Sequence, residues 1–215
     1  MRKPFKTLCN FKTYRTVNLI NPYIMSLIPK SGLILEWLFS GNTYDTSGYS
    51  QNGSVVNATL TNDRKNKANS AYSFNGSTAK ISISDLNIGK VNSISVWFYK
   101  NASHDDTIIG VDASYYFRFS NNSLTTRTLG GYTTLSVPTF TLNTWNHAVF
   151  VRNNATIKVY INNVYVGSVN LPYNEDYLFR GVGGFSNFWM NGYIDDCRIY
   201  TRQLAVNEIN ALYNE

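Results

Sequence analysis

The sequence predicts an all-β fold, an antiparallel β-sandwich with a short C-terminal helix. The first observation is that several short stretches alternate apolar and polar residues, the period of a strand with one better-buried face. The second is that Asn- and Gly-rich turns separate these stretches. The third is composition: the chain has 16 Tyr and 12 Phe, and aromatic residues favour pleated sheets.

The clearest stretch runs from residue 145 to residue 168, WNHAVFVRNNATIKVYINNVYVGS. It contains three alternating segments and two tight turns. The pair Asn162-Asn163 stands where a two-residue hairpin requires positive φ, which Asn tolerates better than other non-Gly residues. These features predict a three-stranded meander, the repeating unit of an antiparallel sandwich.

Further strands are expected before this meander. Residues 33–39, LILEWLF, are apolar on both faces and form the first strand. Residues 60–71 are a polar excursion, whose cationic side chains we expect to be solvated: Arg64, Lys65 and Lys67. Strands follow at about 72–75, 79–84 and 93–100. Residues 101–142 are expected to be a variable, loop-rich region, which is where ligand specificity usually lies.

After the meander, LPYNEDYLFR is expected to be a polar connection, followed by a short strand at 181–185. The last strand is GYIDDCRIY. The C-terminal LAVNEINALYNE predicts a short helix, with one face formed by Leu204, Ile209, Leu212 and Tyr213. Ala205 stands at the position before the acidic turn, where a Ser or Thr cap would be stronger.

Five stretches in this order resemble the laminin G-like, concanavalin A-like jelly-roll domains. Besides the central meander they are LILEWLFSGNTYDTSGYSQNG, YSFNGSTAKISISD, SISVWFY and GYIDDCRIYTRQLAVNEINALY. The resemblance covers residues 32–215 and implies a concanavalin A-like sandwich. It says less about activity, because one fold hosts many functions.

Charge divides the chain into an arm, residues 1–31, and a domain, residues 32–215. Six of the 19 basic residues lie in residues 1–30, which contain no acid. The remaining 13 basic residues balance 13 acidic ones, so the whole net charge of +6 belongs to the arm. We expect this basic, aromatic arm to order against a partner and anchor the domain. The alternatives are a disordered leader, or translation that begins at Met25.

The sequence predicts neither a membrane span nor a secretory signal. No segment reaches about 18 apolar residues, and the N-terminal segment lacks a continuous apolar run with a small-residue cleavage site. Cys197 is expected to be a small buried hydrophobe. A disulfide between Cys9 and Cys197 has no support from any spacing rule.

The resemblance implies a structural calcium ion that pins the first loop to the last strand. The matching positions are Asp45 and Asp195, with Asp196 as a second-choice ligand. Calcium takes six to eight hard oxygen ligands, so backbone carbonyls would complete the site. The alternative is that Asp45 and Asp195 only hydrogen-bond the loop backbone.

A carbohydrate site needs an aromatic platform flanked by amides and carboxylates. Trp37, Trp97 and Trp145 fall at positions that are core in this fold, whereas Trp189 lies in a turn before the last strand. The candidate residues are therefore Trp189, Asn187, Tyr115, Tyr116, Tyr132, Asp105 and Asp106. The alternative is that Phe188 and Trp189 only cover the edge of the sandwich.

Catalysis is not expected. A retaining glycosidase needs two carboxyls about 5 Å apart, and neither the four Glu residues nor Asp195-Asp196 fit, because neighbouring strand residues point to opposite faces. The two histidines give no zinc spacing; His147 is expected to be a packed structural residue. Nucleic acid binding is not expected either, since the domain is neutral and carries no recognition motif.

The sequence therefore predicts a non-enzymatic binding or adhesion module. The jelly-roll resemblance and the basic arm suggest a virion structural protein, such as a phage head fibre, decoration or tail-associated protein, that binds a glycan or another cell-surface ligand. Other virion proteins would bind the arm, and the expected location is the virion or an extracellular surface. A symmetric homo-oligomer would follow for such a component. The alternatives are a free or cell-surface lectin and, less favoured, a glycoside hydrolase.

Overall fold

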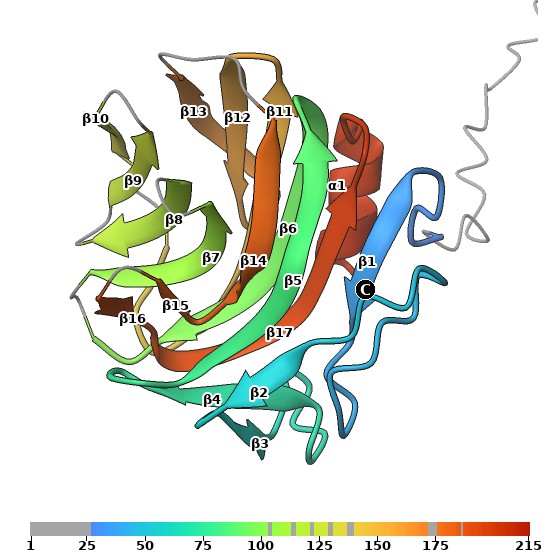
Figure 1. The fold of residues 1–215 in the computed structure, drawn as a ribbon, viewed down its shortest axis with the longest axis vertical. Helices are drawn as coiled ribbons and strands as arrows, with labels where there is room; N and C mark the ends of the chain where they lie inside the picture. Colours follow the sequence, from blue (N-terminus) through green and yellow to red (C-terminus); the bar gives the residue numbers. More distant parts are fainter. Residues whose placement is uncertain are drawn as a thin grey trace, which may run out of the picture.

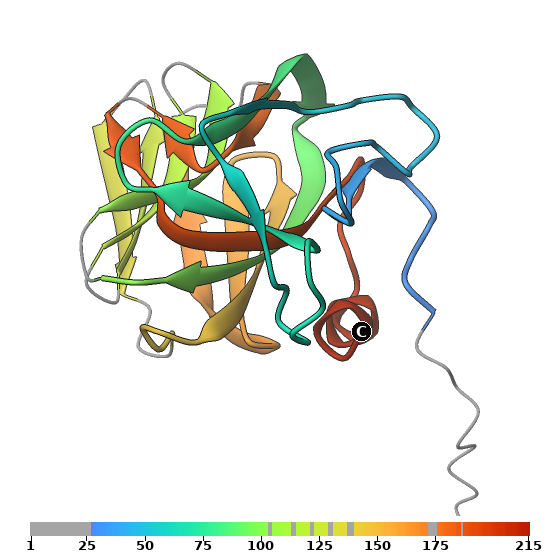
Figure 2. The ribbon, with the colours of Figure 1, turned by 90° about the horizontal axis from the view of Figure 1, so that it is seen from below.

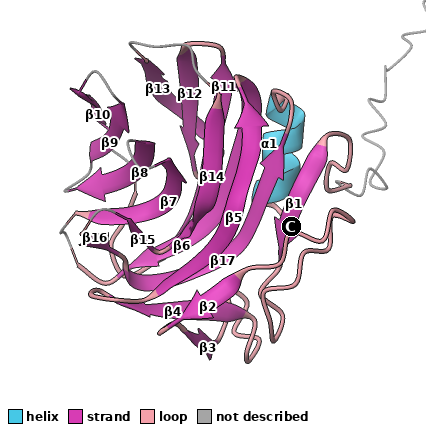
Figure 3. Ribbon diagram, viewed as in Figure 1, coloured by secondary structure: helices cyan, strands magenta, loops and turns pink. Residues whose placement is uncertain are grey.

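The protein is a two-sheet antiparallel sandwich with one helix (Figures 1 and 3). The computed structural model describes residues 27–102, 105–112, 115–120, 123–128, 131–136, 140–171, 176–185 and 187–215. The predicted fold class is confirmed. The arm prediction and Cys9 fall on residues 1–26, which lie outside the described residues.

The first sheet has eight strands, in the order β13-β12-β11-β6-β17-β4-β3, with β1 also paired to β17. Its strands are β1 (Leu33–Trp37), β3 (Thr59–Thr61), β4 (Ala71–Asn75), β6 (Val91–Lys100), β11 (Trp145–Asn153), β12 (Thr156–Ile161), β13 (Val164–Asn170) and β17 (Asn191–Tyr200). The predicted meander is therefore β11-β12-β13. Its turn residues Asn162 and Asn163 have φ of 49° and 65°, as a two-residue hairpin requires.

The second sheet has seven strands, in the order β10-β9-β8-β7-β14-β5-β2. They are β2 (Ser54–Val56), β5 (Lys80–Gly89), β7 (Asp106–Asp112), β8 (Tyr115–Ser120), β9 (Ser123–Thr128), β10 (Gly131–Ser136) and β14 (Tyr177–Val182). A separate hairpin joins β15 (Gly184–Phe185) to β16 (Phe188–Trp189).

Two expectations about loops were wrong. The region 101–142 contains β7 to β10, because its short segments place apolar residues such as Phe117, Phe119 and Leu124 in the core between polar neighbours. The polar connection ends at Asp176, and β14 follows directly, because Tyr177 and Phe179 bury their rings in the core.

The core fills the space between the two sheets. Trp37, Phe98, Phe150 and Phe179 are each at most 1% exposed. The sheets meet through stacked rings: Phe98 packs against Phe119 at 4.9 Å between centroids, and Phe150 packs on Phe117 at 4.2 Å. Burying one such side chain contributes about 1.5–3 kcal/mol, so these contacts dominate the cohesion of the sandwich.

The helix α1 (Val206–Tyr213) covers the outer face of the first sheet beside β1 (Figure 2). Ile209 and Leu212 pack on Val149 and Val151 in a second apolar cluster. This explains why β11 is buried on both faces, although its alternation predicted only one better-buried face. Ala205 gives no side-chain cap, as expected, but the Glu208 carboxylate accepts the Ala205 N–H at 2.9 Å.

The helix is too short to span a membrane, and the described part of the chain has no helix that is long and apolar enough to do so.

Candidate functional site

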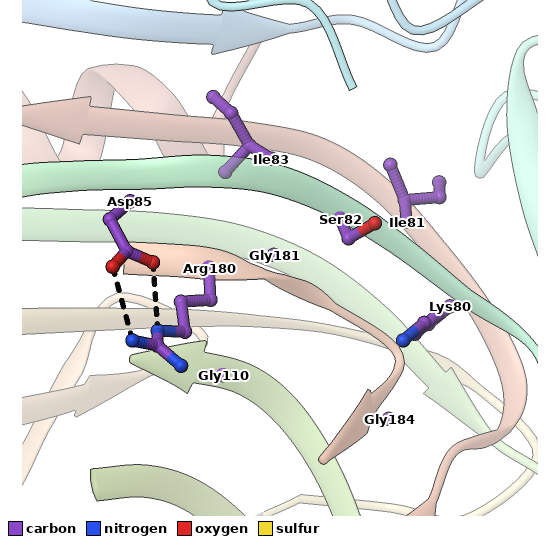
Figure 4. Close-up of a pocket in the computed structure, with 9 residues that line it drawn as sticks. All are labelled: Lys80, Ile81, Ser82, Ile83, Asp85, Gly110, Arg180, Gly181 and Gly184. Atoms are coloured by element: carbon purple, nitrogen blue, oxygen red, sulfur yellow. Dashed lines mark hydrogen bonds and ion pairs between the residues drawn. The ribbon is translucent and has the colours of Figure 1, made fainter. Parts of the chain in front are cut away.

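A hollow of about 280 Å³ opens on the outer face of the second sheet, where β5, β14 and β7 meet (Figure 4). The alternation of β5 places its lining side chains. Ile81 is fully buried in the core, so Lys80 and Ser82 face away from it. On β14, Phe179 is buried in the same way and Arg180 faces out.

Glycines form the floor of this hollow. Gly110 of β7 and Gly181 of β14 pair directly across the two strands, and Gly184 lies in β15. Gly181 has a φ of 140°, and a Cβ there would lie 2.0 Å from the Ile81 carbonyl oxygen. Only glycine allows this close approach of two backbones. The floor of the hollow is therefore formed by glycine backbone without side chains.

An ion pair closes one end of the hollow. Arg180 Nε lies 2.9 Å from Asp85 Oδ1, and Arg180 Nη2 donates to Asp85 Oδ2 at 3.1 Å. The register between β5 and β14 shifts twice, the second time between Phe179 and Gly181, and the resulting bulge turns Asp85 outward. Both groups are solvent-accessible, so the pair itself adds little stability. It offers a ligand both a hydrogen-bond acceptor and a donor in a fixed geometry.

A second, polar hollow of about 400 Å³ continues from the first. The two share Ser82 and Ile83, so they lie side by side along β5. The lining of the second hollow is mostly hydroxyl and amide groups: Ser50, Gln51, Asn52, Ser54, Ser82 and Ser84. We call the two hollows together the β5 groove.

Asp45 shapes the loop at the far end of the β5 groove. Its carboxylate accepts the backbone N–H groups of Glu36, Ser47 and Gln51, each at 2.9 Å, and the Ser47 hydroxyl at 2.8 Å. Burial would raise the pKa of Asp45, but these backbone hydrogen bonds together lower it below its usual value. Asp45 thus accepts hydrogen bonds from the backbone, which is the alternative to calcium binding that the sequence analysis gave for it.

The structure brings several predicted sugar-site residues together next to the β5 groove. The Trp189 ring is half-buried and packs against Gly184, 2.2 Å from where a Cβ would be. Asn187 is exposed at the hairpin turn, with a φ of 68°. Phe188 lies under the Arg118 guanidinium, 4.2 Å from its ring centroid, and Arg118 also pairs with Asp105 at 3.1 Å.

The other predicted residues have different places. Asp106 is fully buried and pairs with the buried Lys100 at 2.7 Å, so its place is structural. Tyr115 and Tyr116 belong to β8 and Tyr132 to β10, but their side chains lie outside the described residues. The strand register sets Tyr116 opposite Gly110, at the floor of the groove.

Sequence reasoning missed an aromatic patch on the outer face of the first sheet. Trp37 and Trp97 are buried as expected, but Trp145 is only half-buried. Its ring meets Tyr99 at 5.9 Å and Tyr193 at 6.2 Å. The register of three adjacent strands creates this contact. The rings are tilted by 39–69° to one another, so they pack on each other rather than forming a flat platform.

Asp195, predicted as a calcium ligand, instead forms an ion pair with the Arg64 side chain. Arg64 Nη1 lies 2.6 Å from both Asp195 Oδ2 and Asp196 Oδ2, and its guanidinium stacks on Trp97 at 4.7 Å. Arg64 is therefore not a solvated loop residue, and that expectation was wrong. As they lie, these groups do not fit calcium, because protein donors occupy the oxygens of Asp45 and a guanidinium bridges Asp195 and Asp196. Chelation tests whether calcium nevertheless binds there.

The two neighbouring carboxylates share a face, contrary to expectation. A bulge separates Asp195 from Arg198 in the β17–β6 register, and Asp196 has a φ of 40°, so the alternation fails here. Burial and the charge of Asp196 raise the pKa of Asp195 to about 7. The pair neutralises Arg64, a structural task. In the described part of the chain no group of three or more His, Cys, Asp or Glu could hold a metal.

His147 and Cys197 are structural, as expected. The His147 imidazole lies between β-strands, with Nε2 2.7 Å from Ser95 Oγ and its ring stacked on Trp97. Burial lowers the pKa of His147 to about 3, with help from Arg64 and Arg198. Cys197 is a free, fully buried thiol, and burial raises its pKa to about 12.

Comparison with known proteins agrees with this architecture. The family model described as the concanavalin A-like lectin/glucanases superfamily matches residues 74–210. A search of curated proteins found no match. Many solved structures share the fold.

One of these structures is domain 4 of AbnA, an extracellular arabinanase from Geobacillus stearothermophilus, in complex with arabinotriose. It is 20% identical with a TM-score of 0.62, over 86% of this chain and 100% of that domain. Another is the receptor-binding domain of botulinum neurotoxin C/D mosaic serotype. It is 20% identical with a TM-score of 0.68, and the match covers 86% of this chain and 52% of that chain.

The serotype D ligand-binding domain of botulinum neurotoxin, in complex with N-acetylneuraminic acid, is also 20% identical. Its TM-score is 0.65, and the match covers 86% of this chain and 51% of that chain. The chain spans about half the length of the neurotoxin domains that it matches. Sequence identities of about 20% to these solved structures show a shared fold. The family model matches well over half of the chain, which is enough to assign the family. The chain belongs to the concanavalin A-like lectin/glucanase superfamily.

Proposed function

We propose that this protein is a non-enzymatic carbohydrate-binding module whose ligand lies in the β5 groove. The observation that carries the proposal is the groove itself: bare glycine backbone beside a fixed Asp85–Arg180 pair, continued by a row of hydroxyl and amide groups. A chain of sugars presents hydroxyls along its length, and such a groove offers donors and acceptors to them.

Two comparisons support this class of ligand. Domain 4 of AbnA, which the match covers completely, was solved with arabinotriose, and one neurotoxin domain was solved with N-acetylneuraminic acid. A module without catalysis is favoured because its closely placed carboxylates are bound to arginines. Arg198 lies 2.9 Å from Glu36 and 2.8 Å from Glu215, and Arg64 bridges the Asp195–Asp196 pair. A glycosidase needs such carboxyls free to act as acid and nucleophile.

A glycan array with the full chain tests the proposal, followed by titration with the best oligosaccharide. Ser82→Tyr fills the shared centre of the groove at an outward strand position, where Tyr is compatible with the sheet. We expect it to weaken binding at least about tenfold, because the ligand loses its contact with the groove floor. Lys158→Tyr is the matched control, at an exposed position of β12 in the other sheet.

A blank array from the folded protein contradicts the proposal, as does binding that Ser82→Tyr leaves intact. Equal melting temperatures of the two variants establish that any difference in binding comes from the groove.

We further propose that the arm attaches the module to an assembly such as a virion. The supporting observation is charge: all of the net +6 belongs to residues 1–30, and the remainder is neutral. Deletion of residues 1–26 is expected to leave the melting temperature of the sandwich unchanged and to abolish co-sedimentation with the assembly. Retained co-sedimentation contradicts the anchor.

A further inference from the structure

The charges around the β5 groove point to the class of sugar that it binds. The first hollow is lined by two cationic side chains, Lys80 and Arg180, and one carboxylate, Asp85. The second hollow has no charged side chain in its lining. The groove therefore carries an excess of one positive charge, and all of it lies at the glycine floor.

The two cations differ in whether a carboxylate of the protein already pairs with them. Arg180 directs Nε and Nη2 to Asp85, which leaves Nη1 as the nitrogen that Asp85 does not contact. Lys80 has no hydrogen bond or ion pair with any described residue, although it lines the hollow. In Figure 4 the Lys80 ammonium points into the hollow from the side opposite the Asp85–Arg180 pair.

A hollow lined by two cations and one carboxylate suits an anion better than a neutral hydroxyl. Ser82 stands between them on β5, and Gly110, Gly181 and Gly184 line the hollow without side chains of their own. A carboxylate or sulfate oxygen placed there gains charge-assisted hydrogen bonds, which are roughly twice as strong as neutral ones. Neutral sugar units fit the uncharged second hollow.

We infer that the β5 groove selects acidic oligosaccharides, in which one unit carries a carboxylate or sulfate held between Lys80 and Arg180. This inference rests on the proposed function. It adds a charge preference that carbohydrate binding alone does not require.

The test compares trigalacturonic acid with its methyl ester and with a sulfated trisaccharide, by titration of the full chain. We expect the acidic probe to bind at least about fivefold more tightly than its ester. Its affinity should fall between 50 and 500 mM NaCl, because the Debye length shortens from about 14 Å to about 4 Å over this range. Lys80→Gln is expected to remove most of the preference and the salt dependence. Lys158→Gln, an exposed lysine on the other sheet, is the control for net charge.

The outcomes separate the two proposals. Ester and acid binding equally, with no effect of Lys80→Gln, overturns the acidic preference and leaves carbohydrate binding intact. Binding of no probe, together with a blank glycan array, overturns both. A preference for the carboxylated probe assigns the anion as a uronate-type group, and a preference for the sulfated probe assigns it as a sulfate ester. Arg180→Gln repeats the test at the second cation, should Lys80→Gln fail to fold.

Discussion

Replacing Arg64 by Met removes the cation that bridges the buried carboxylates of Asp195 and Asp196. The side chains of Arg64, Asp195 and Asp196 are 9%, 2% and 9% exposed, and both contacts are 2.6 Å. Met keeps the apolar contact with Trp97, so the variant isolates the charge. Breaking a buried pair by removing one partner costs about 3–5 kcal/mol, against less than about 1 kcal/mol for a surface pair. We expect a loss of about 3 kcal/mol in the free energy of unfolding at pH 8.

The loss should shrink at lower pH. The pKa of Asp195 is raised in the folded protein, to about 7, while in the unfolded chain it has its ordinary value near 3.8. The folded state therefore binds more protons between pH 4 and 7, so this group stabilises the protein as pH falls through that window. Protonation also relieves the unpaired charge that Arg64→Met leaves behind.

Urea unfolding at pH 8 and pH 5 measures both effects. Lys65→Met, an exposed neighbour in the same loop, is the control and should change the free energy of unfolding by less than about 0.5 kcal/mol. A loss below 1 kcal/mol for Arg64→Met, or a loss that grows at pH 5, refutes the reasoning.

Three further results are expected. Gly181→Ala should cost more than about 3 kcal/mol or prevent folding, because its Cβ would meet the Ile81 carbonyl, whereas Gly89→Ala, also at positive φ but in open space, should cost about 1 kcal/mol in urea unfolding; equal costs contradict the close approach. His147 should show no NMR titration between pH 5 and 8, since its pKa is about 3; a midpoint near 6.5 would mean that it is exposed. Chelator and added calcium should each leave the melting temperature unchanged, because protein groups already bind the candidate carboxylates; a fall with chelator would support the calcium prediction.

The regular strands could be predicted because their signal is local. Residues 145–168 alternate with period two and carry Asn at both hairpin positions. The structure has three strands there, and both Asn162 and Asn163 have positive φ. The helix was equally local, with Ile209 and Leu212 on its buried face. Such patterns need no knowledge of distant residues.

The site could be predicted only in part, because its contacts join distant strands. Trp189 was singled out as an aromatic residue in a turn, and it does lie against Gly184 at the groove. The groove was missed, since its floor comes from glycines on different strands, and a glycine in a sequence does not reveal what it faces. Arg64 looked like a loop cation because its partner Asp195 is 131 residues away.

The local failures have a physical cause as well. Asp195 and Asp196 were assigned to opposite faces on the strength of strand alternation. A bulge with a φ of 40° at Asp196 breaks that alternation. The residue type at this position does not predict a bulge. The aromatic patch of Trp145, Tyr99 and Tyr193 likewise depends on strand register, which one sequence does not specify.

The central claim is that the β5 groove is where a sugar binds. The most direct measurement is NMR chemical-shift mapping of the isotope-labelled full chain, titrated with the best oligosaccharide from the glycan array. The account predicts that the largest amide shifts fall on Ser82, Asp85 and Arg180. Shifts concentrated instead at Tyr99, Trp145 and Tyr193, on the outer face of the other sheet, would contradict it.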